Sequence, residues 1–472
     1  MGSVRAAHEA FVTGHSGTDS PMDVILAVSS AFPASVLSVA VVQGRVGWQW
    51  FALDCLILVT PVALGFTILA DHTPLMFLVF TTLAALAVGV TRPSGAAQER
   101  RHTDDEKKEG SGRRVGCVTS FRALLNLATT IAILAVDFHC FPRRFAKTEV
   151  QGYSIMDVGA AGFVVANGLV EGRRQVALRV VARDVAVLMC LGVVRLAMVW
   201  ASDYQHHVTE YGVHGNFFFT LAAIKLTCSW WAWRVGRLSA MILLLVLTYA
   251  HHLLLTVGGV GAWTLGPAPR DTLVSANREW LVSLPSYVAL YLFGAALGAL
   301  VCDSDRSKRA RVPLFLWCVV AVSAVSLALL HTYVDPPSRR LGNAAFVAFS
   351  VLYATITLAI TPKDLGKHTH FLTLTLFQVL YATITLAIFS LCDLWLPKWL
   401  PGTPSTPTLF TAINRRPLLS FLLSNLTTGL INKSINTLDV QHPWDFCVVL
   451  THTFGVLAVV YFLYKGDGEG RR

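Results

Sequence analysis

Apolar segments of about 20 residues recur along the whole chain, and they constrain its fold more than any other feature. Each approaches the ~20 residues that a helix needs to cross a bilayer. Backbone amides inside lipid must be paired within their own segment, which favours helices. The sequence therefore predicts an all-α, polytopic transmembrane helix bundle. The fourteen segments are 23–43, 48–71, 74–92, 117–138, 154–171, 184–201, 215–233, 238–257, 285–302, 313–332, 343–360, 371–392, 417–433 and 446–464.

The charge and cysteine content agree with this class. Of the 472 residues, 54% are hydrophobic and 14% charged, whereas soluble domains carry about 25% charged residues. The net charge is +10, but the basic residues stand in short clusters between apolar segments, which is typical of loops that flank spans rather than of nucleic-acid binding. The nine cysteines form no C-x-x-C pair and no metal-ligand spacing. We expect no nucleic-acid partner, no metal and no bound cofactor.

Lys and Arg are concentrated in alternate loops, which predicts the orientation of the chain. The richer set includes the run 93–116, the arginines from Arg173 to Arg183, and the run "DSDRSKRARV". Loops rich in Lys and Arg face the cytoplasm, so we expect the N-terminus and the stretch 136–157 on the opposite side of the membrane. The run 93–116 is strongly charged, and we expect it to be a disordered cytoplasmic loop.

The decapeptide "VLYATITLAI" occurs twice, at 351–360 and at 379–388. The offset predicts that 351–378 is a duplicated or inserted segment, and removing it leaves about thirteen spans. A direct repeat that occurs once does not indicate a solenoid. We therefore expect one integral membrane domain over 1–472.

The most charged stretch between two apolar segments is "VDFHCFPRRFAKTEVQGYSIMD", residues 136–157. Ionisable groups beside or within a membrane are costly and often functional. Asp137 stands at the end of a span, where a low dielectric favours a basic carboxylate, and cations such as Lys147 can stabilise an oxyanion or hold phosphate. Contact with lipid headgroups, acyl transfer and ion transport all fit these residues, and their spacing alone does not decide among them.

Several motifs resemble those of one family. "DFHCFPRRFAKTEVQGYSIMDVGAAGFV" is similar to the D-F-x-x-F-P-R-R-F-A-K-T-E…G-x-S-x-M-D-x-G signature of the inositol acyltransferases of GPI-anchor synthesis. Further matches follow along the chain: "HEAFVTGHSGTDS", "EYGVHGNFFFTL", "SANREWLVSLPSYVALYL", "RRLGNAAFV" and "INRRPLLSFLLSNLTTGLINKSINTL". The resemblance covers nearly the whole chain. Three positions depart from the family pattern: Gly215 stands at a usual Trp, and Trp280 and Ser286 stand at usual glycines.

The resemblance implies an acyl-CoA-dependent enzyme of the endoplasmic reticulum membrane. Such an enzyme transfers a fatty acyl chain from acyl-CoA, a co-substrate, to the inositol of glucosaminyl-phosphatidylinositol. Membrane lipids are its other expected partners, and the sequence identifies no protein partner. The resemblance also implies thirteen spans.

Resemblance and chemistry together assign roles to the charged stretch. We expect Asp137 to act as the general base for the inositol hydroxyl and Lys147 to stabilise the thioester oxyanion or orient the acyl donor. Structural ion pairing in a loop is the alternative for this pair. The predicted substrate-binding residues are Arg143, Arg144, Glu149, Asp157, His214, Asn216, Asn277, Arg278 and Glu279.

Two other functional classes remain open from the residues alone. One is a different membrane-bound O-acyltransferase with a buried histidine as base, and His214 would then carry the chemistry. The other is a lipid or solute transporter, with Asp184, Arg195 and Lys225 as charges along a pathway. A transporter should show inverted internal repeats, whereas the repeat found here is direct and local.

Overall fold

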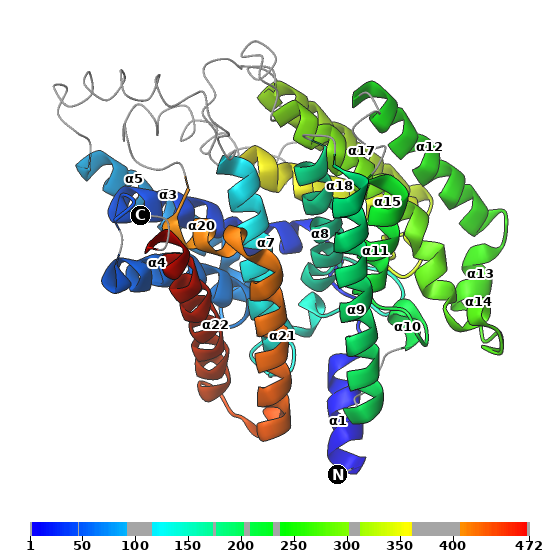
Figure 1. Cartoon of the computed structure of the whole chain (residues 1–472), viewed down its shortest axis with the longest axis horizontal. Helices are drawn as coiled ribbons and strands as arrows, with labels where there is room; N and C mark the ends of the chain where they lie inside the picture. The colour runs from blue at the N-terminus through cyan, green and yellow to red at the C-terminus, as the bar shows by residue number, and fades with distance from the viewer. Residues whose placement is uncertain are drawn as a thin grey trace. The chain divides into compact units, whose positions relative to one another are not determined.

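A computed structural model describes residues 2–45, 47–91, 116–172, 176–202, 208–229, 237–301, 312–360 and 406–469. These residues are predominantly helical (Figure 1), which confirms the predicted all-α class. Within the described ranges, bridge pairing between extended residues is limited to His15 with Thr148 and Thr18 with Tyr153.

Every expected apolar segment that falls in these ranges is helical. The first segment is α2 (Pro21–Ser29) followed directly by α3 (Ala31–Val42). The others are α4 (Trp48–Phe66), α5 (Thr73–Val90), α7 (Gly116–Ala135), α8 (Ile155–Glu171), α9 (Leu178–Ser202), α11 (Phe217–Cys228), α12 (Arg237–Thr256), α15 (Arg278–Val301), α17 (Val312–Tyr333), α18 (Ala344–Ile360), α21 (Pro417–Ser434) and α22 (Trp444–Glu469). The segment 371–392, the second copy of the repeated decapeptide and nearly all of the loop 93–116 lie outside the described residues.

Eight helical stretches of the described chain are long and apolar enough to cross a membrane, and α11 and α18 supply two shorter apolar stretches. This agrees with a polytopic membrane protein. The remaining expected spans, in α8, α9 and α21, are helices of 17, 25 and 18 residues. Thirteen crossings stay a prediction.

One boundary differs from expectation in a way that matters for function. The ninth span was expected to begin at residue 285, with Arg278 and Glu279 in the preceding loop, but α15 begins at Arg278. The two polar residues form its first turn, where a carboxylate such as that of Glu279 interacts favourably with the helix dipole. Hydropathy alone hides this extension because it is polar.

The chain divides into two compact units. Unit 1 contains 1–19 and 146–356, and unit 2 contains 20–145 and 357–472. The shorter elements of unit 1 are α1 (Gly2–Val12), α10 (Val208–Tyr211), α13 (Val260–Leu265) and α14 (Leu273–Ala276); those of unit 2 are α20 (Thr408–Arg415) and the 3-10 turns η1 (Ala70–His72), η2 (Arg143–Phe145) and η4 (Thr437–Asp439). That residues 1–472 act as one catalytic domain stays a prediction.

Unit 1 is built on the close packing of α8 against α15 (Figure 1). A Cβ atom on Gly168 of α8 would lie 2.2 Å from the carbonyl oxygen of Tyr291, and one on Gly298 of α15 would lie 2.2 Å from that of Leu169. Small residues at such crossings let two backbones approach closely, as is common between membrane helices. Helix α12 also packs on α15, and α11 packs on α9.

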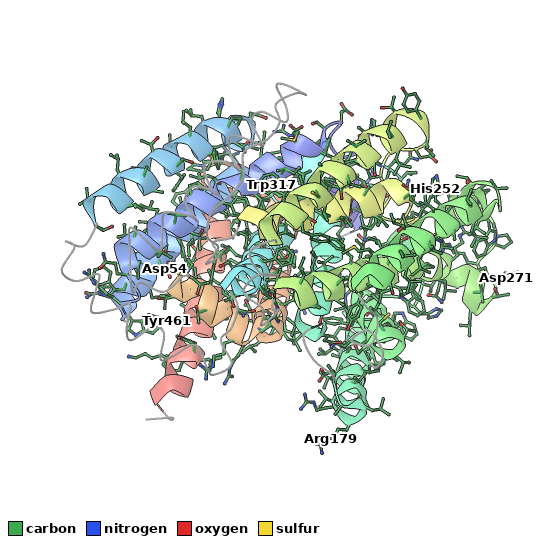
Figure 2. All side chains as sticks on the ribbon, turned by 90° about the horizontal axis from the view of Figure 1, so that it is seen from above. Asp54, Arg179, His252, Asp271, Trp317 and Tyr461 are labelled. Carbon is green, nitrogen blue, oxygen red and sulfur yellow. The ribbon has the colours of Figure 1, made fainter. Side chains whose placement is uncertain are left out.

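Unit 2 contains two helix groups that meet where α4 packs on α7, α20 and α22. Helix α3 packs on α4 and α5, while α7, α20, α21 and α22 pack on one another. Asp54 of α4, labelled in Figure 2, is fully buried and accepts hydrogen bonds from Ser38 and from the backbone amide of Leu409, the latter at 2.7 Å. The first amides of a helix lack intrahelical partners. The carboxylate of Asp54, on α4, therefore caps the N-terminus of α20.

Candidate functional site

The charged stretch 136–157 is divided between the two units. Asp137, Arg143 and Arg144 belong to unit 2, whereas Lys147, Glu149 and Asp157 belong to unit 1. Each unit therefore carries part of the predicted site.

In unit 1, Asp157 fixes the loop that carries Lys147. Ser154 caps α8 by accepting from the amide of Met156, which places Asp157 in the first turn of the helix. One carboxylate oxygen of Asp157 accepts from the amide and the hydroxyl of Thr148, at 3.1 and 2.5 Å. The other lies 2.7 Å from Nε of Arg339, which is also buried. A buried carboxylate needs such partners, so Asp157 ties the residue after Lys147 to α8.

The same loop is held by the N-terminal segment. The amide of Glu149 donates to the carbonyl oxygen of His15 and that of Thr18 to Tyr153, both at 2.8 Å. Gly152 has a φ of +133°, and a Cβ atom there would lie 1.8 Å from the carbonyl oxygen of Ser16. Only glycine fits this crossing, which makes the loop backbone a defined platform for Lys147.

Lys147 forms an ion pair with a residue that sequence reasoning did not select. Its Nζ lies 2.7 Å from Oε1 of Glu210, and Nη2 of Arg339 lies 3.8 Å from the same oxygen. Burial opposes ionisation of Glu210, but Lys147 and Arg339 outweigh it and lower the pKa of the carboxyl to about 2. Glu210 is therefore ionised at neutral pH and fixes the ammonium group.

These residues line a small cavity of about 50 Å³, which has room for one or a few water molecules. Lys147, Glu149, Glu210, Arg339 and Arg340 all contribute to its wall. The structure thus brings the predicted residues Lys147 and Glu149 together, with Asp157 behind them.

Glu279 is the centre of a second charged cluster in unit 1. Its fully buried carboxylate lies 2.5 Å from Nη2 of Arg270, 3.1 Å from Nη2 of Arg340 and 3.6 Å from Nε of Arg278. Arg278 also donates to the carbonyl oxygens of Gly266 and Ala268, at 2.7 and 2.9 Å. Three guanidinium groups around one carboxylate leave a local excess of positive charge, and Arg340 joins this cluster to the cavity.

The predicted residues His214, Asn216 and Asn277 organise the backbone near α10. Oδ1 of Asn277 accepts from the amides of His214 and Gly215, at 2.8 and 3.1 Å, and its Nδ2 lies 3.2 Å from Nδ1 of His214. Asn216 caps α11 by accepting from two amides of its first turn. These contacts place Glu210, a few residues earlier, opposite Lys147.

Two of the three departures from the family pattern lie side by side. A Cβ atom on Gly215 would lie 3.1 Å from Cβ of Trp280 and 2.0 Å from the carbonyl oxygen of Tyr211. The indole Nε1 of Trp280 donates to Oγ1 of Thr220 at 3.0 Å. The Trp280 side chain therefore stands next to the position that a side chain at residue 215 would occupy. The third departure, Ser286, donates to the carbonyl oxygen of Gly342.

In unit 2, Asp137 lies two residues beyond the end of α7 and is 5% exposed. Its Oδ2 accepts from Nδ2 of Asn432 at 2.7 Å. Asn432 lies on α21, so this hydrogen bond joins that helix to the loop after α7.

The two arginines of this stretch are engaged in different ways. Arg143 donates to backbone carbonyl oxygens of its own loop, those of Val136, Phe138 and Phe141. Burial lowers the pKa of Arg143 to about 10, and Asp137 opposes this shift. Arg144 pairs with the exposed Asp71. In this conformation Arg143 shapes the loop, whereas Arg144 stands near the surface.

A larger cavity of about 630 Å³ lies in unit 2. It is lined by Ile68, His139, Cys140, Leu438, Val440, Gln441, His442 and Asp445. Its wall includes His139, two residues from Asp137, and Cys140, whose thiol pKa is raised by burial and by the Asp445 carboxylate. A thiol kept protonated is a poor nucleophile.

Two of the three charges suggested for a transport pathway, Lys225 and Asp184, are paired in this structure. Nζ of Lys225 forms an ion pair with Glu171 and lies 3.6 Å from Oδ2 of Asp184. Glu171 also accepts from Ser229 and Tyr291. These contacts join four helices of unit 1 and are typical of a structural polar cluster between membrane helices.

Glu210, Arg339 and Arg340 are functional candidates that sequence reasoning missed. They stand in the motifs "EYGVHGNFFFTL" and "RRLGNAAFV", which carried the resemblance. Their distance from Lys147 along the chain hid the contact.

The fold and the charged loops define an all-α, polytopic membrane protein with polar clusters next to its helix ends. The family model described as GWT1 matches residues 4–463, and the chain belongs to this family. It is 30% identical over 464 residues to GPI-anchored wall transfer protein 1 of Kluyveromyces lactis, covering 94% of this chain and 93% of that protein. It is 31% identical to the glucosaminyl-phosphatidylinositol-acyltransferase PIGW of Bos taurus, with 88% of each covered, and 33% identical to that of Homo sapiens, with 74% and 73% covered.

Proposed function

We propose that this protein transfers a fatty acyl chain from acyl-CoA to an inositol hydroxyl of glucosaminyl-phosphatidylinositol in GPI-anchor biosynthesis. Support comes from family membership over nearly the whole chain and from relatives named as acyltransferases of that lipid. The observation that carries the chemistry is the nearly buried Asp137 carboxylate, held by Asn432 at 2.7 Å just beyond α7.

Asp137 acts as the general base. A sugar hydroxyl is a weak nucleophile until its proton is removed, and a positioned carboxylate contributes about 10²–10⁴-fold to such a step. As the proton moves to Asp137, the inositol oxygen attacks the thioester carbonyl and a C–O bond forms. The C–S bond then breaks, and the CoA thiolate leaves and takes up the proton. The thiolate is a good leaving group, so no strong acid is required.

Lys147 stabilises the oxyanion of the tetrahedral intermediate or orients the acyl donor. Its side chain is 46% exposed while paired with Glu210, so it can turn toward a bound substrate. A cation aimed at developing negative charge is a large catalytic contribution when it is pre-positioned. Asp157 and Glu210 are positioning residues in this proposal, because they act through Lys147.

The other predicted substrate-binding residues divide into two groups in this proposal. Arg144 lies near the surface and Glu149 lies in the wall of the small cavity. Both bind polar parts of the substrates. The others support the backbone and the charged clusters around them: Arg143, His214, Asn216, Asn277, Arg278 and Glu279.

The distribution of Lys and Arg supports a luminal N-terminus, and membership of the family supports an endoplasmic reticulum membrane. In this orientation the loop containing Asp137 and Lys147 faces the lumen. Cysteine-accessibility labelling in sealed microsomes tests this topology, and labelling of the loops 93–116 and 139–153 from the same side would contradict it.

The activity is tested with microsomes from cells that lack their own inositol acyltransferase. The full chain should restore acyl-CoA-dependent conversion of glucosaminyl-phosphatidylinositol to its acylated form. Lys147→Met, which keeps the length of the side chain without its charge, should lose most of this conversion. A wild-type chain that accumulates in the membrane without acylating the lipid would overturn the proposal.

A further inference from the structure

The larger cavity of unit 2 has the size and composition of a ligand site. At about 630 Å³ it falls within the range of roughly 300–1,000 Å³ that is typical of small-molecule sites. Its wall combines the apolar side chains Ile68, Leu438 and Val440 with polar groups from the segment 441–445 and from the loop after Asp137. Such a mixture suits a ligand with both C–H faces and hydrogen-bonding groups.

The charge of the wall selects against anionic ligands. None of the described residues that line this cavity is Lys or Arg, and the acidic side chain among them is Asp445. The phosphates of CoA and of a phosphoinositide require cations or several amide donors. The wall therefore fits hydroxyl and amine groups, which donate hydrogen bonds, better than it fits phosphate.

His442 and Asp445 form the polar centre of this wall. Nδ1 of His442 lies 3.2 Å from Oδ1 of Asp445, and the carboxylate is 1% exposed while the imidazole side chain is 59% exposed. A carboxylate that accepts from Nδ1–H fixes the tautomer of the ring and leaves Nε2 as an acceptor. The amide of Phe446 also donates to Oδ1 of Asp445, at 2.7 Å, which holds the carboxylate in place. Its Oδ2 has no hydrogen-bond partner among the described residues.

We propose that this cavity receives the amino-sugar part of the acceptor headgroup, with Nε2 of His442 as hydrogen-bond acceptor and Asp445 as the charge that favours an amine. This inference rests on the proposed function, because that function supplies a glucosaminyl group as part of the acceptor. His139, at the wall of the cavity, is two residues from Asp137, so the sugar would be bound close to the proposed base within the same unit.

The test compares KM for the two substrates in microsomes containing the full chain. His442→Ala removes the acceptor and should raise KM for glucosaminyl-phosphatidylinositol about tenfold, the effect of one good hydrogen bond, with KM for acyl-CoA unchanged. His442→Gln, which keeps an acceptor oxygen, should recover most of this loss. His72→Ala, an exposed imidazole of unit 2 that does not line the cavity, is the matched control.

The role of Asp445 is tested with an acceptor whose amine is acetylated. The wild type should favour the free amine, and Asp445→Asn should reduce this preference at least fivefold. An Asp445→Asn variant with the wild-type preference for the free amine would contradict the role of Asp445 in binding the amine. A wild type without this preference would also contradict it.

The outcomes separate this inference from the proposed function. A wild-type chain without acyl transfer overturns both. An active wild type whose His442→Ala variant shows an unchanged KM for the acceptor, or a changed KM for acyl-CoA, overturns the cavity assignment alone. An equal loss in His442→Gln and His442→Ala also overturns it, because acceptance of a hydrogen bond would then not be the function of the residue.

Discussion

The ammonium group of Lys147 lies 2.7 Å from the carboxylate of Glu210. Arg339 lies near the same carboxylate and 2.7 Å from Asp157. Alternating charges thus connect Lys147 to the first turn of α8 through residues that are far apart in sequence. Each buried charge has an opposite partner, so the removal of one leaves another unpaired.

Glu210→Gln should lower acyl transfer by about 10- to 100-fold, because Lys147 loses the partner that positions it. The change keeps the size of the side chain, so the protein should still accumulate in the membrane. The measurement is the initial rate of lipid acylation in microsomes, normalised to protein level. Glu9→Gln, on an exposed face of α1, is the control. Full activity of the Glu210 variant would show that Lys147 does not depend on this pair.

The stability contributed by Glu210 should depend on pH. Its pKa is about 2 in the folded protein against an ordinary value of 4.5, and a lowered carboxyl pKa stabilises the folded state above the unfolded value. The contribution is therefore present above pH 4.5 and is lost as the pH falls from 4.5 toward 2. The unfolding temperature of wild type should exceed that of Glu210→Gln at pH 7, and the difference should shrink below pH 4.5. A difference that grows on acidification would contradict the assignment.

Gly215 and Trp280 should be energetically coupled. Gly215→Trp alone introduces a side chain where a Cβ atom already meets Trp280 and the carbonyl oxygen of Tyr211, and Trp280→Gly alone leaves a cavity. Trp280 is half-buried, so its loss should cost less than the roughly 3–5 kcal/mol that is typical of removing a fully buried Trp side chain. The double variant should be more stable than the sum of the two single effects predicts, by about 0.5–3 kcal/mol. Thermal unfolding in detergent measures the coupling, and strict additivity would contradict it.

The crossing of α8 and α15 should tolerate no side chain at Gly168. A Cβ atom there would lie 2.2 Å from the carbonyl oxygen of Tyr291, whereas one on Gly159 of the same helix meets nothing within 4 Å. Gly168→Ala should destabilise by about 1–3 kcal/mol, the usual cost of overpacking. Gly159→Ala is the control and should be neutral or slightly stabilising, because alanine favours helix. Equal unfolding temperatures for the two variants would refute the close crossing.

The helices could be predicted because each expected span that falls in the described residues is one continuous apolar segment of nearly bilayer length. The start of α15 was missed because Arg278 and Glu279 are polar although they are helical. Asp137 and Lys147 were found through one short motif. Glu210 and Arg339 were not found, because their ion pairs join residues that are far apart in the sequence. Such pairs form only when the fold brings α8 and α10 together. Likewise, nothing in the sequence around Asp445 indicates that it lines a cavity with His139.

The most direct test of the account is the rate of inositol acylation by Asp137→Asn. The asparagine keeps the size of the side chain and can still contact Asn432, but it cannot take a proton. Asp439→Asn is a matched control, because Asp439 accepts a bond of the same kind from Asn436, also at 2.7 Å, in an exposed position of unit 2. We expect acylation by Asp137→Asn to fall at least about 100-fold at an unchanged protein level, while Asp439→Asn stays near wild type. Turnover by Asp137→Asn within a few-fold of wild type would contradict the assignment of Asp137 as the base.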